Sequence, residues 1–175
     1  MKRRWKLVMA SVMGLVSATV GLLGLPGCEL AMPVRGPGFD AKRGVMLPDA
    51  GETVVVAVTH AVVDRDKRGP FDEYTQKVAA SLPEQPGFIA YSLRIRPFGD
   101  EVWTMTMWVH DDAVDSFTAS PVHVRAIREG MPAVTAAQFL RFDWPSRGAP
   151  PSWDEIKRRL ASAPTIDYRA AGSRK

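Results

Sequence analysis

Residues 53–63 read TVVVAVTHAVV, a run of β-branched and small apolar residues with few polar interruptions. Such a run predicts a central β-strand that is covered on both faces. A helix is expected next, because Pro70 suits a first helical position and Phe71, Tyr74 and Val78 recur at helical spacing. The chain therefore begins its folded part with a strand and a helix.

Further strand and helix patterns follow in a regular order. Residues 88–98 and 101–110 alternate apolar and polar side chains around a short turn, which predicts a β-hairpin. A broken helix is expected next, with Asp111 or Asp112 as the first N-cap and Ser120-Pro121 at the start of the second piece. The remaining predicted elements are a strand over residues 137–144 and a short amphipathic helix over residues 152–163.

The order strand, helix, strand, strand, helix, strand predicts an α+β domain, a ferredoxin-like split βαβ plait (βαββαβ), over residues 52–146. We expect the first and third strands to lie side by side and parallel at the centre of the sheet. The two helices cover one face, so the apolar second face needs another cover. A second copy of the chain, as in a dimeric α+β barrel, is the simplest cover and predicts a homodimer. Cover by residues 28–51 or by the C-terminal helix and tail, residues 147–175, is the alternative.

The chain begins with a segment that lies outside this domain. Basic residues precede an apolar run over residues 7–25, which is typical of a secretory signal peptide. Leu25-Pro26-Gly27-Cys28 resembles a bacterial lipobox, so we predict that residues 1–27 are removed and that Cys28 is acylated. The protein is then expected to be lipid-anchored in the bacterial cell envelope, with its domain on the periplasmic or extracellular side. An uncleaved membrane helix is the alternative.

Removal of that segment changes the charge of the protein. The whole chain carries a formal charge of +4, and residues 1–27 hold four basic residues and no acid, which leaves +4 − 4 = 0. A neutral chain gives no support for a nucleic-acid partner. Residues 28–51 are rich in proline and glycine and lack apolar periodicity, so we predict a flexible tether there. Residues 168–175 are expected to be a frayed tail.

The second half of the predicted domain carries motifs of a known family. Residues 104–127 read TMTMWVHDDAVDSFTASPVHVRAI: a strand ends in Trp108, a helix carries Phe117, and Ser120-Pro121-Val122-His123 follows. Together with Pro86-Gly87-Phe88 at the second strand, this pattern resembles the antibiotic biosynthesis monooxygenase (ABM) domains of the dimeric α+β barrel superfamily. The resemblance identifies the fold better than the chemistry, because this fold hosts several activities.

All three histidines are predicted to lie at one rim of the sheet. His60 comes late in the first strand, His110 ends the third, and His123 is the third residue of the helix that Ser120 caps. The positive end of the helix dipole disfavours imidazolium, so we expect a neutral His123 that accepts a proton. Each histidine also has a structural interpretation: a hydrogen bond within the sheet, an acid pair at a strand end, or helix packing.

The ABM resemblance implies a site for a small aromatic ligand. The predicted catalytic residues are His123 as the base or hydrogen-bond partner, Trp108 as a pocket wall, and His60 as the polar residue late in the first strand. The predicted ligand-binding residues are Phe117, Tyr74 and Arg94.

Three functions fit these residues. The first is a cofactor-independent monooxygenase acting on a small aromatic substrate, without metal or cofactor. A haem-degrading branch is less favoured, because His60 stands where that branch has asparagine. The second is a non-catalytic envelope lipoprotein that uses the fold for binding or scaffolding. The third and least favoured is a metal site of His60, His110 and His123, which requires all three rings around one ion.

Overall fold

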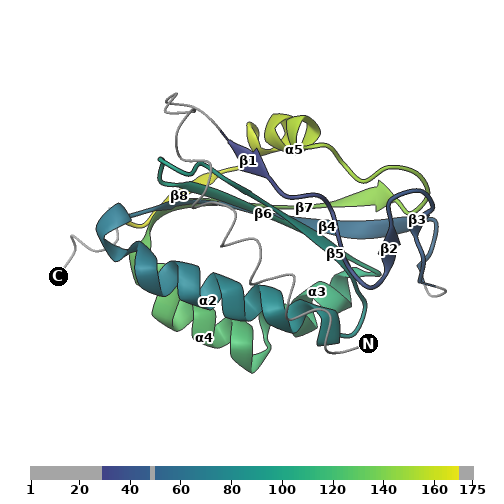
Figure 1. The fold of residues 1–175 in the computed structure, drawn as a ribbon, viewed down its shortest axis with the longest axis horizontal. Helices are drawn as coiled ribbons and strands as arrows, with labels where there is room; N and C mark the ends of the chain where they lie inside the picture. The colour runs from purple at the N-terminus through teal and green to yellow at the C-terminus, as the bar shows by residue number, and fades with distance from the viewer. Residues whose placement is uncertain (1–28, 48–49, 170–175) are drawn as a thin grey trace, which may run out of the picture.

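The structure, a computed structural model, describes residues 29–47 and 50–169. Within these residues lie a six-stranded antiparallel sheet, a two-stranded ribbon and four α-helices (Figure 1). The strands of the sheet are β1 (Leu30–Ala31), β4 (Thr53–Val63), β5 (Phe88–Ile95), β6 (Glu101–Trp108), β7 (Val134–Pro145) and β8 (Thr165–Asp167). The ribbon pairs β2 (Phe39–Asp40) with β3 (Gly44–Val45). The helices are α2 (Arg68–Ser81), α3 (Asp111–Thr118), α4 (Pro121–Gly130) and α5 (Trp153–Leu160), and the 3₁₀ turns are η1 (Arg65–Lys67), η2 (Leu82–Glu84) and η3 (Met131–Ala133).

The predicted α+β plait is confirmed, with strand order β1-β5-β6-β4-β7-β8. As predicted, the first and third strands of the plait, β4 and β6, are neighbours. They are antiparallel, however, with Val55 opposite Trp108 and His60 opposite Trp103. The parallel prediction is wrong because the right-handed crossover joins β4 to β5 through α2, and β6 fits between these two strands antiparallel to both.

Helices α2, α3 and α4 lie on one face of the sheet (Figure 1). The Ser120 hydroxyl caps α4 by accepting the His123 N–H at 3.4 Å, and Pro121 occupies the first turn, as predicted. The cap of α3 is His110, whose Nδ1 accepts the Ala113 N–H at 3.2 Å, rather than either predicted aspartate. His110 takes this place because its backbone is still extended where the helix begins. The apolar cluster under these helices consists of Val55, Leu82, Phe88, Tyr91, Trp108, Ala113, Val114 and Phe117.

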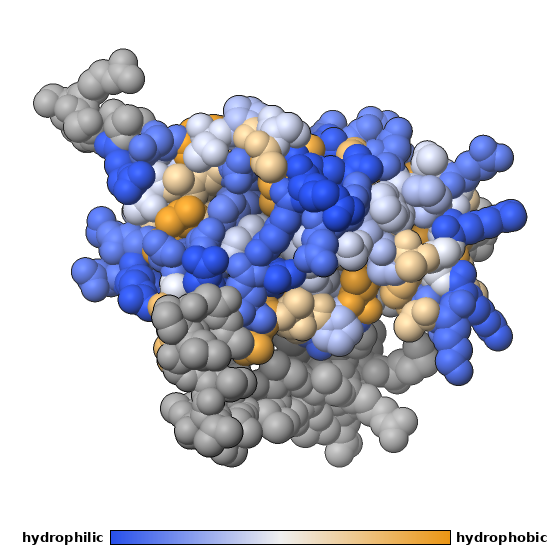
Figure 2. Space-filling model, turned by 90° about the horizontal axis from the view of Figure 1, so that it is seen from above, coloured by the Kyte–Doolittle hydropathy of each residue, from blue (hydrophilic) through white to orange (hydrophobic). Residues whose placement is uncertain are grey.

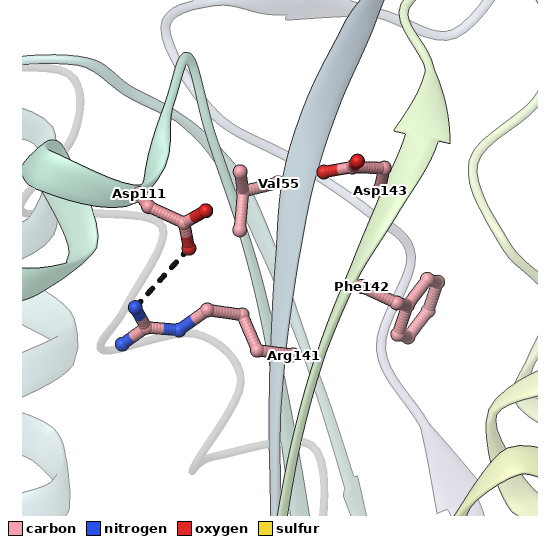
Figure 3. Close-up of a pocket in the computed structure, with 5 residues that line it drawn as sticks. All are labelled: Val55, Asp111, Arg141, Phe142 and Asp143. Carbon is pink, nitrogen blue, oxygen red and sulfur yellow. Dashed lines mark hydrogen bonds and ion pairs between the residues drawn. The ribbon is translucent and has the colours of Figure 1, made fainter.

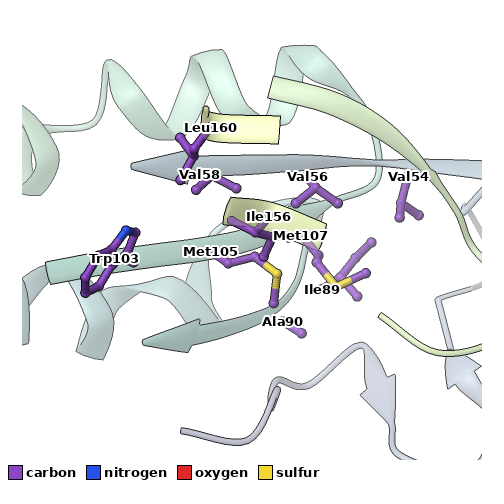
Figure 4. Close-up of a cluster of buried hydrophobic side chains, with 10 residues drawn as sticks. All are labelled: Val54, Val56, Val58, Ile89, Ala90, Trp103, Met105, Met107, Ile156 and Leu160. Carbon is purple, nitrogen blue, oxygen red and sulfur yellow. The ribbon is translucent and has the colours of Figure 1, made fainter. Parts of the chain in front are cut away.

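The opposite face of the sheet is covered by the chain itself. Helix α5 and the β2–β3 ribbon lie on this side in Figure 1, whereas β1 extends the sheet beside β5. The buried cluster there comprises Val54, Val56, Val58, Ile89, Ala90, Trp103, Met105, Met107, Ile156 and Leu160 (Figure 4). Viewed from this side, the molecule is mostly hydrophilic, with apolar atoms in separate small patches (Figure 2). The reason for expecting a second copy on this face is therefore removed, and the homodimer stays a prediction.

Residues 29–47 are not a free tether. The Met32 and Gly38 N–H groups donate to the carbonyls of Leu93 and Ile89 at 2.8 and 3.0 Å. Gly36 lets this segment approach closely, because a Cβ at that position would overlap the Ile89 carbonyl oxygen. The tether prediction is wrong over its described part because backbone bonds to the open edge of β5 require no apolar pattern along the segment.

The C-terminal part forms the predicted helix α5, with Ser152 as its N-cap, and adds β8 beside β7. The Tyr168 N–H donates to the Thr135 carbonyl at 3.0 Å, and the rest of the predicted tail, from residue 170, lies outside the described residues. The predicted signal peptide and Cys28 also lie outside them. In the part of the chain that the structure describes, no helix has the length and apolar character needed to cross a membrane.

Candidate functional site

A series of aromatic rings leads from the sheet to α4. Trp108, at the end of β6, is fully buried, and its ring centroid lies 4.9 Å from that of Phe117 on α3. Phe117 in turn lies 4.9 Å from His123 near the start of α4. Phe88 packs edge-on against Trp108 at 5.3 Å. The structure thus brings together three of the predicted site residues: Trp108, Phe117 and His123.

His123 is held in one protonation state and one tautomer. Its Nδ1 lies 3.1 Å from the Thr118 carbonyl oxygen, which can only accept, so Nδ1 carries a hydrogen. Burial lowers the pKa of the His123 imidazole, and the hydrogen bond to Thr118 offsets only part of this effect. The ring is therefore neutral near pH 7, and its Nε2 has a lone pair that can accept a proton.

Trp108 adds a hydrogen-bond donor that sequence reasoning missed. Its indole Nε1 is buried and has no hydrogen-bond partner among the described residues. A buried donor without a partner costs about 1–3 kcal/mol, so a ligand oxygen that accepted this hydrogen would be favoured. The sequence identified Trp108 as a wall of the site, and no sequence signal shows whether an indole N–H is paired.

Tyr74 lies in the contact between α2 and α4. Its ring faces the Lys77 ammonium at 4.4 Å and the Arg125 guanidinium at 5.9 Å, and its Cβ lies close to Gly130. These contacts place Tyr74 in the packing of the helix pair rather than in the ring series. Its predicted role in ligand binding has no support from these contacts.

His60 and Arg94 lie on the other face of the sheet, away from His123. The His60 ring stacks on Trp103 at 4.7 Å, and its Nδ1 and Nε2 lie 3.0 and 3.2 Å from side-chain oxygens of Gln138 and Glu101. Arg94 forms an ion pair with Glu29. These contacts give both residues a structural role on the α5 side.

The three histidines do not share one rim. Five strand residues, about 17 Å, separate the His60–Trp103 pair from the Val55–Trp108 pair beside α3. The prediction of one rim is wrong because it depended on a parallel pairing of β4 and β6. The separation of the histidines also argues against a metal site built on these three residues. Among the described residues, no group of His, Cys, Asp and Glu side chains is arranged to hold a metal ion.

A polar hollow of about 230 Å³ borders the apolar cluster at Val55 (Figure 3). Arg141 lies across it, with Nη1 3.1 Å from Asp111 Oδ1 and 2.8 Å from Asp115 Oδ1. Burial works against the charge of Arg141, but these two carboxylates raise its pKa above the ordinary value. The Arg141 cation is thus already balanced by acids of α3. The five residues that line the hollow are Val55, Asp111, Arg141, Phe142 and Asp143.

Comparison with known proteins agrees with this fold. Residues 53–129 match the family model described as antibiotic biosynthesis monooxygenase (ABM). The comparison with curated proteins found no match.

Several solved structures match part of this chain. A proposed antibiotic biosynthesis monooxygenase from Caulobacter crescentus CB15 is 18% identical, with 53% of this chain and 91% of that chain covered at a TM-score of 0.49. A variant of SnoaB, a cofactor-independent oxygenase from Streptomyces nogalater, is 20% identical, with 59% and 98% covered at a TM-score of 0.46. Rv0793 from Mycobacterium tuberculosis is 15% identical, with 57% and 96% covered at a TM-score of 0.46.

The matched range holds β4, α2, the β5–β6 hairpin, α3 and nearly all of α4, and thus every residue of the ring series. The segments that cover the other face of the sheet, residues 29–47 and α5, lie outside it. Residues 53–129 therefore match the ABM family model, and they lie in an α+β fold that the rest of the chain completes.

Proposed function

We propose that the protein is a lipid-anchored, cofactor-independent monooxygenase that acts on a small, electron-rich aromatic substrate. The observation that carries this proposal is the state of His123, a neutral imidazole whose Nε2 carries the lone pair that can accept a proton, near the buried Phe117 and Trp108 rings. A base next to aromatic surfaces suits a substrate that is acidic and planar.

The chemistry needs only a base, a binding surface and dioxygen. His123 takes a proton from a phenolic O–H or from a doubly benzylic C–H, and the Trp108 Nε1–H stabilises the oxygen on which negative charge develops. The substrate anion then supplies the electrons that reduce dioxygen. For a methylene carbon the balance is R₂CH₂ + O₂ → R₂C=O + H₂O: one oxygen atom enters the substrate and the other leaves as water.

The anchor is the acylated Cys28 expected from the Leu25–Cys28 motif. It would hold the domain at the surface of a bacterial membrane, on the periplasmic or extracellular side. The mass of the protein purified from membranes tests this part directly, because acylation at Cys28 and loss of residues 1–27 both change it. An unmodified full-length chain would contradict it.

The oxygenase is tested by dioxygen uptake with phenols and anthrone-type substrates, together with product mass under isotopically labelled dioxygen. We expect uptake and a single labelled oxygen in the product with the native protein. His123→Gln should lower kcat by about 10²–10⁴-fold, the usual contribution of a general base. His110→Asn, which keeps the α3 cap acceptor, is the matched control and should retain activity. Equal rates in the native and His123→Gln proteins would contradict the proposal.

A second candidate is a non-catalytic binding module, and one observation favours it. Trp108 and Phe117 are buried in the apolar cluster between α3 and the sheet, and the hollow that borders this cluster at Val55 is polar and open rather than apolar. Under this alternative His123 only packs against Phe117. A thermal shift produced by aromatic ligands without dioxygen uptake would favour it over the oxygenase.

A further inference from the structure

Glu29, the first described residue of the chain, is held against the domain by three basic side chains. The Glu29 carboxylate accepts hydrogen bonds from Lys157 Nζ at 2.8 Å and Arg96 Nη2 at 3.2 Å, and it pairs with Arg94. Its side chain is only 9% exposed. Leu30 then pairs with Ile95 at the edge of the sheet. The described part of the fold therefore starts at residue 29, which follows Cys28 directly in the sequence.

Exposed apolar side chains lie at this same end of the sheet. Leu30 is 49% exposed, and Phe98, in the turn of the β5–β6 hairpin, is 64% exposed. Arg65 of η1 donates to the Phe98 carbonyl, and Arg68 Nη1 donates to the Gly99 carbonyl at 3.1 Å, so η1 and the start of α2 border the turn. We call residues 29–30, 64–68 and 96–100 together the hairpin end.

We propose that the hairpin end is the surface by which the domain lies on a phospholipid bilayer, an inference that rests on the proposed acylation of Cys28. Adjacent Cα atoms are about 3.8 Å apart, so the acyl chains on Cys28 begin within one residue of the clamped Glu29. Without a spacer the domain cannot stand clear of the bilayer. Leu30 and Phe98 are then the apolar side chains that enter the lipid interface.

We expect the hairpin end to bind the bilayer through apolar contacts rather than through net charge. Lys67 Nζ lies 3.3 Å from Asp64 Oδ2, and Arg68 Nε lies 3.1 Å from Asp72 Oδ2, so these cations are balanced by nearby acids. Attachment at this end directs the opposite end of the sheet, with η2, α3 and the start of α4, toward the aqueous side. The His123 site would then receive its substrate from water.

Depth-dependent fluorescence in membranes tests the orientation. The mature, acylated protein is reconstituted in vesicles of phosphatidylethanolamine and phosphatidylglycerol, and an environment-sensitive dye is attached at Asp66→Cys. This cysteine is the only free thiol, because Cys28 is acylated. Glu84→Cys, on the exposed η2 turn at the opposite end, is the matched position. We expect spin-labelled lipid to quench the dye at position 66 several-fold more than at position 84, with little dependence on salt.

Two surface phenylalanines provide the second comparison. Phe98→Ser should reduce quenching at position 66, whereas Phe139→Ser, which changes a 49% exposed phenylalanine outside the hairpin end, should not. Equal quenching at both dye positions, or stronger quenching at position 84, would overturn the proposed orientation although the anchor itself stands. A protein whose mass shows no acyl group and which does not float with vesicles would overturn the anchor and the orientation together.

Discussion

At the scale of single residues, His123 is the base of the proposed reaction. Ser120, three residues before His123, caps the start of α4. The Thr118 carbonyl oxygen accepts a hydrogen bond from Nδ1 of the His123 ring. The local sequence therefore decides which ring nitrogen is left as an acceptor, and burial beside Phe117 decides that the ring stays neutral.

The pH dependence of kcat/KM follows from this neutral state. Burial places the pKa of His123 below its ordinary value of about 6.5, so the active, neutral form persists into mildly acidic solution. We expect kcat/KM to rise with pH along a limb whose midpoint lies below about 6.5 and then to level off. His123→Gln should abolish this limb and His110→Asn should keep it. A midpoint at or above 6.5 would argue against a buried, neutral base.

Glu29 makes a separate prediction about stability. Burial raises the pKa of its carboxyl, but the hydrogen bonds from Lys157 and Arg94 outweigh burial and lower it. A lowered pKa in the folded state stabilises the fold above about pH 4.3, and this contribution is lost as pH falls through the folded value. Glu29→Gln should cost on the order of 2 kcal/mol in urea unfolding at pH 7 and less at pH 3, where the contribution of the carboxylate has begun to decrease. Glu84→Gln, on an exposed turn, is the control and should change little at either pH.

At the scale of elements, hydrophobic periodicity predicted the strands and helices of the plait, but it did not predict the structure of residues 29–47. The β-branched run at residues 53–63 became β4 with the same bounds, because its side chains are buried on both faces. Residues 29–47 are rich in proline and glycine and are held by backbone hydrogen bonds. Such bonds require no pattern of side chains, so the sequence did not indicate them. Of the predicted site, the Trp108–Phe117–His123 part was found, because these residues are close in sequence; His60 was misplaced because strand direction is a property of the whole topology.

The close approach of residues 29–47 to β5 gives a test at this scale. Gly36→Ala places a Cβ against the Ile89 carbonyl oxygen and the Ala90 Cα, both backbone atoms that cannot move aside cheaply. We expect a loss of about 1–3 kcal/mol in the free energy of unfolding. Gly51→Ala is the matched control, since its nearest neighbour, the Thr53 carbonyl oxygen, is 3.8 Å away. Equal stabilities of the two variants in urea unfolding would show that the segment does not lie against β5.

At the scale of the whole molecule, the chain itself covers the second face of the sheet, which the sequence predicts a second copy would cover. Residues 29–47 and α5 cover the sheet face opposite α2, α3 and α4, and Ile156 and Leu160 of α5 complete its core. A homodimer stays a prediction, and it would have to use a surface other than this face. Glu29, at the start of these residues, is held by Lys157, Arg96 and Arg94 directly after the predicted lipid anchor at Cys28. This contact determines the proposed orientation of the domain on the membrane.

Hydrogen exchange at individual backbone amides of the mature protein tests this self-covered sheet most directly. The amides of Met32, Arg35 and Gly38 donate to carbonyls of β5, and we predict that they exchange orders of magnitude more slowly than the free peptide. Protection of these amides comparable to that of β5 itself would agree with a segment built into the fold. Exchange at the rate of an unstructured chain would mean that residues 29–47 are a tether after all and that the sheet face is open to a partner.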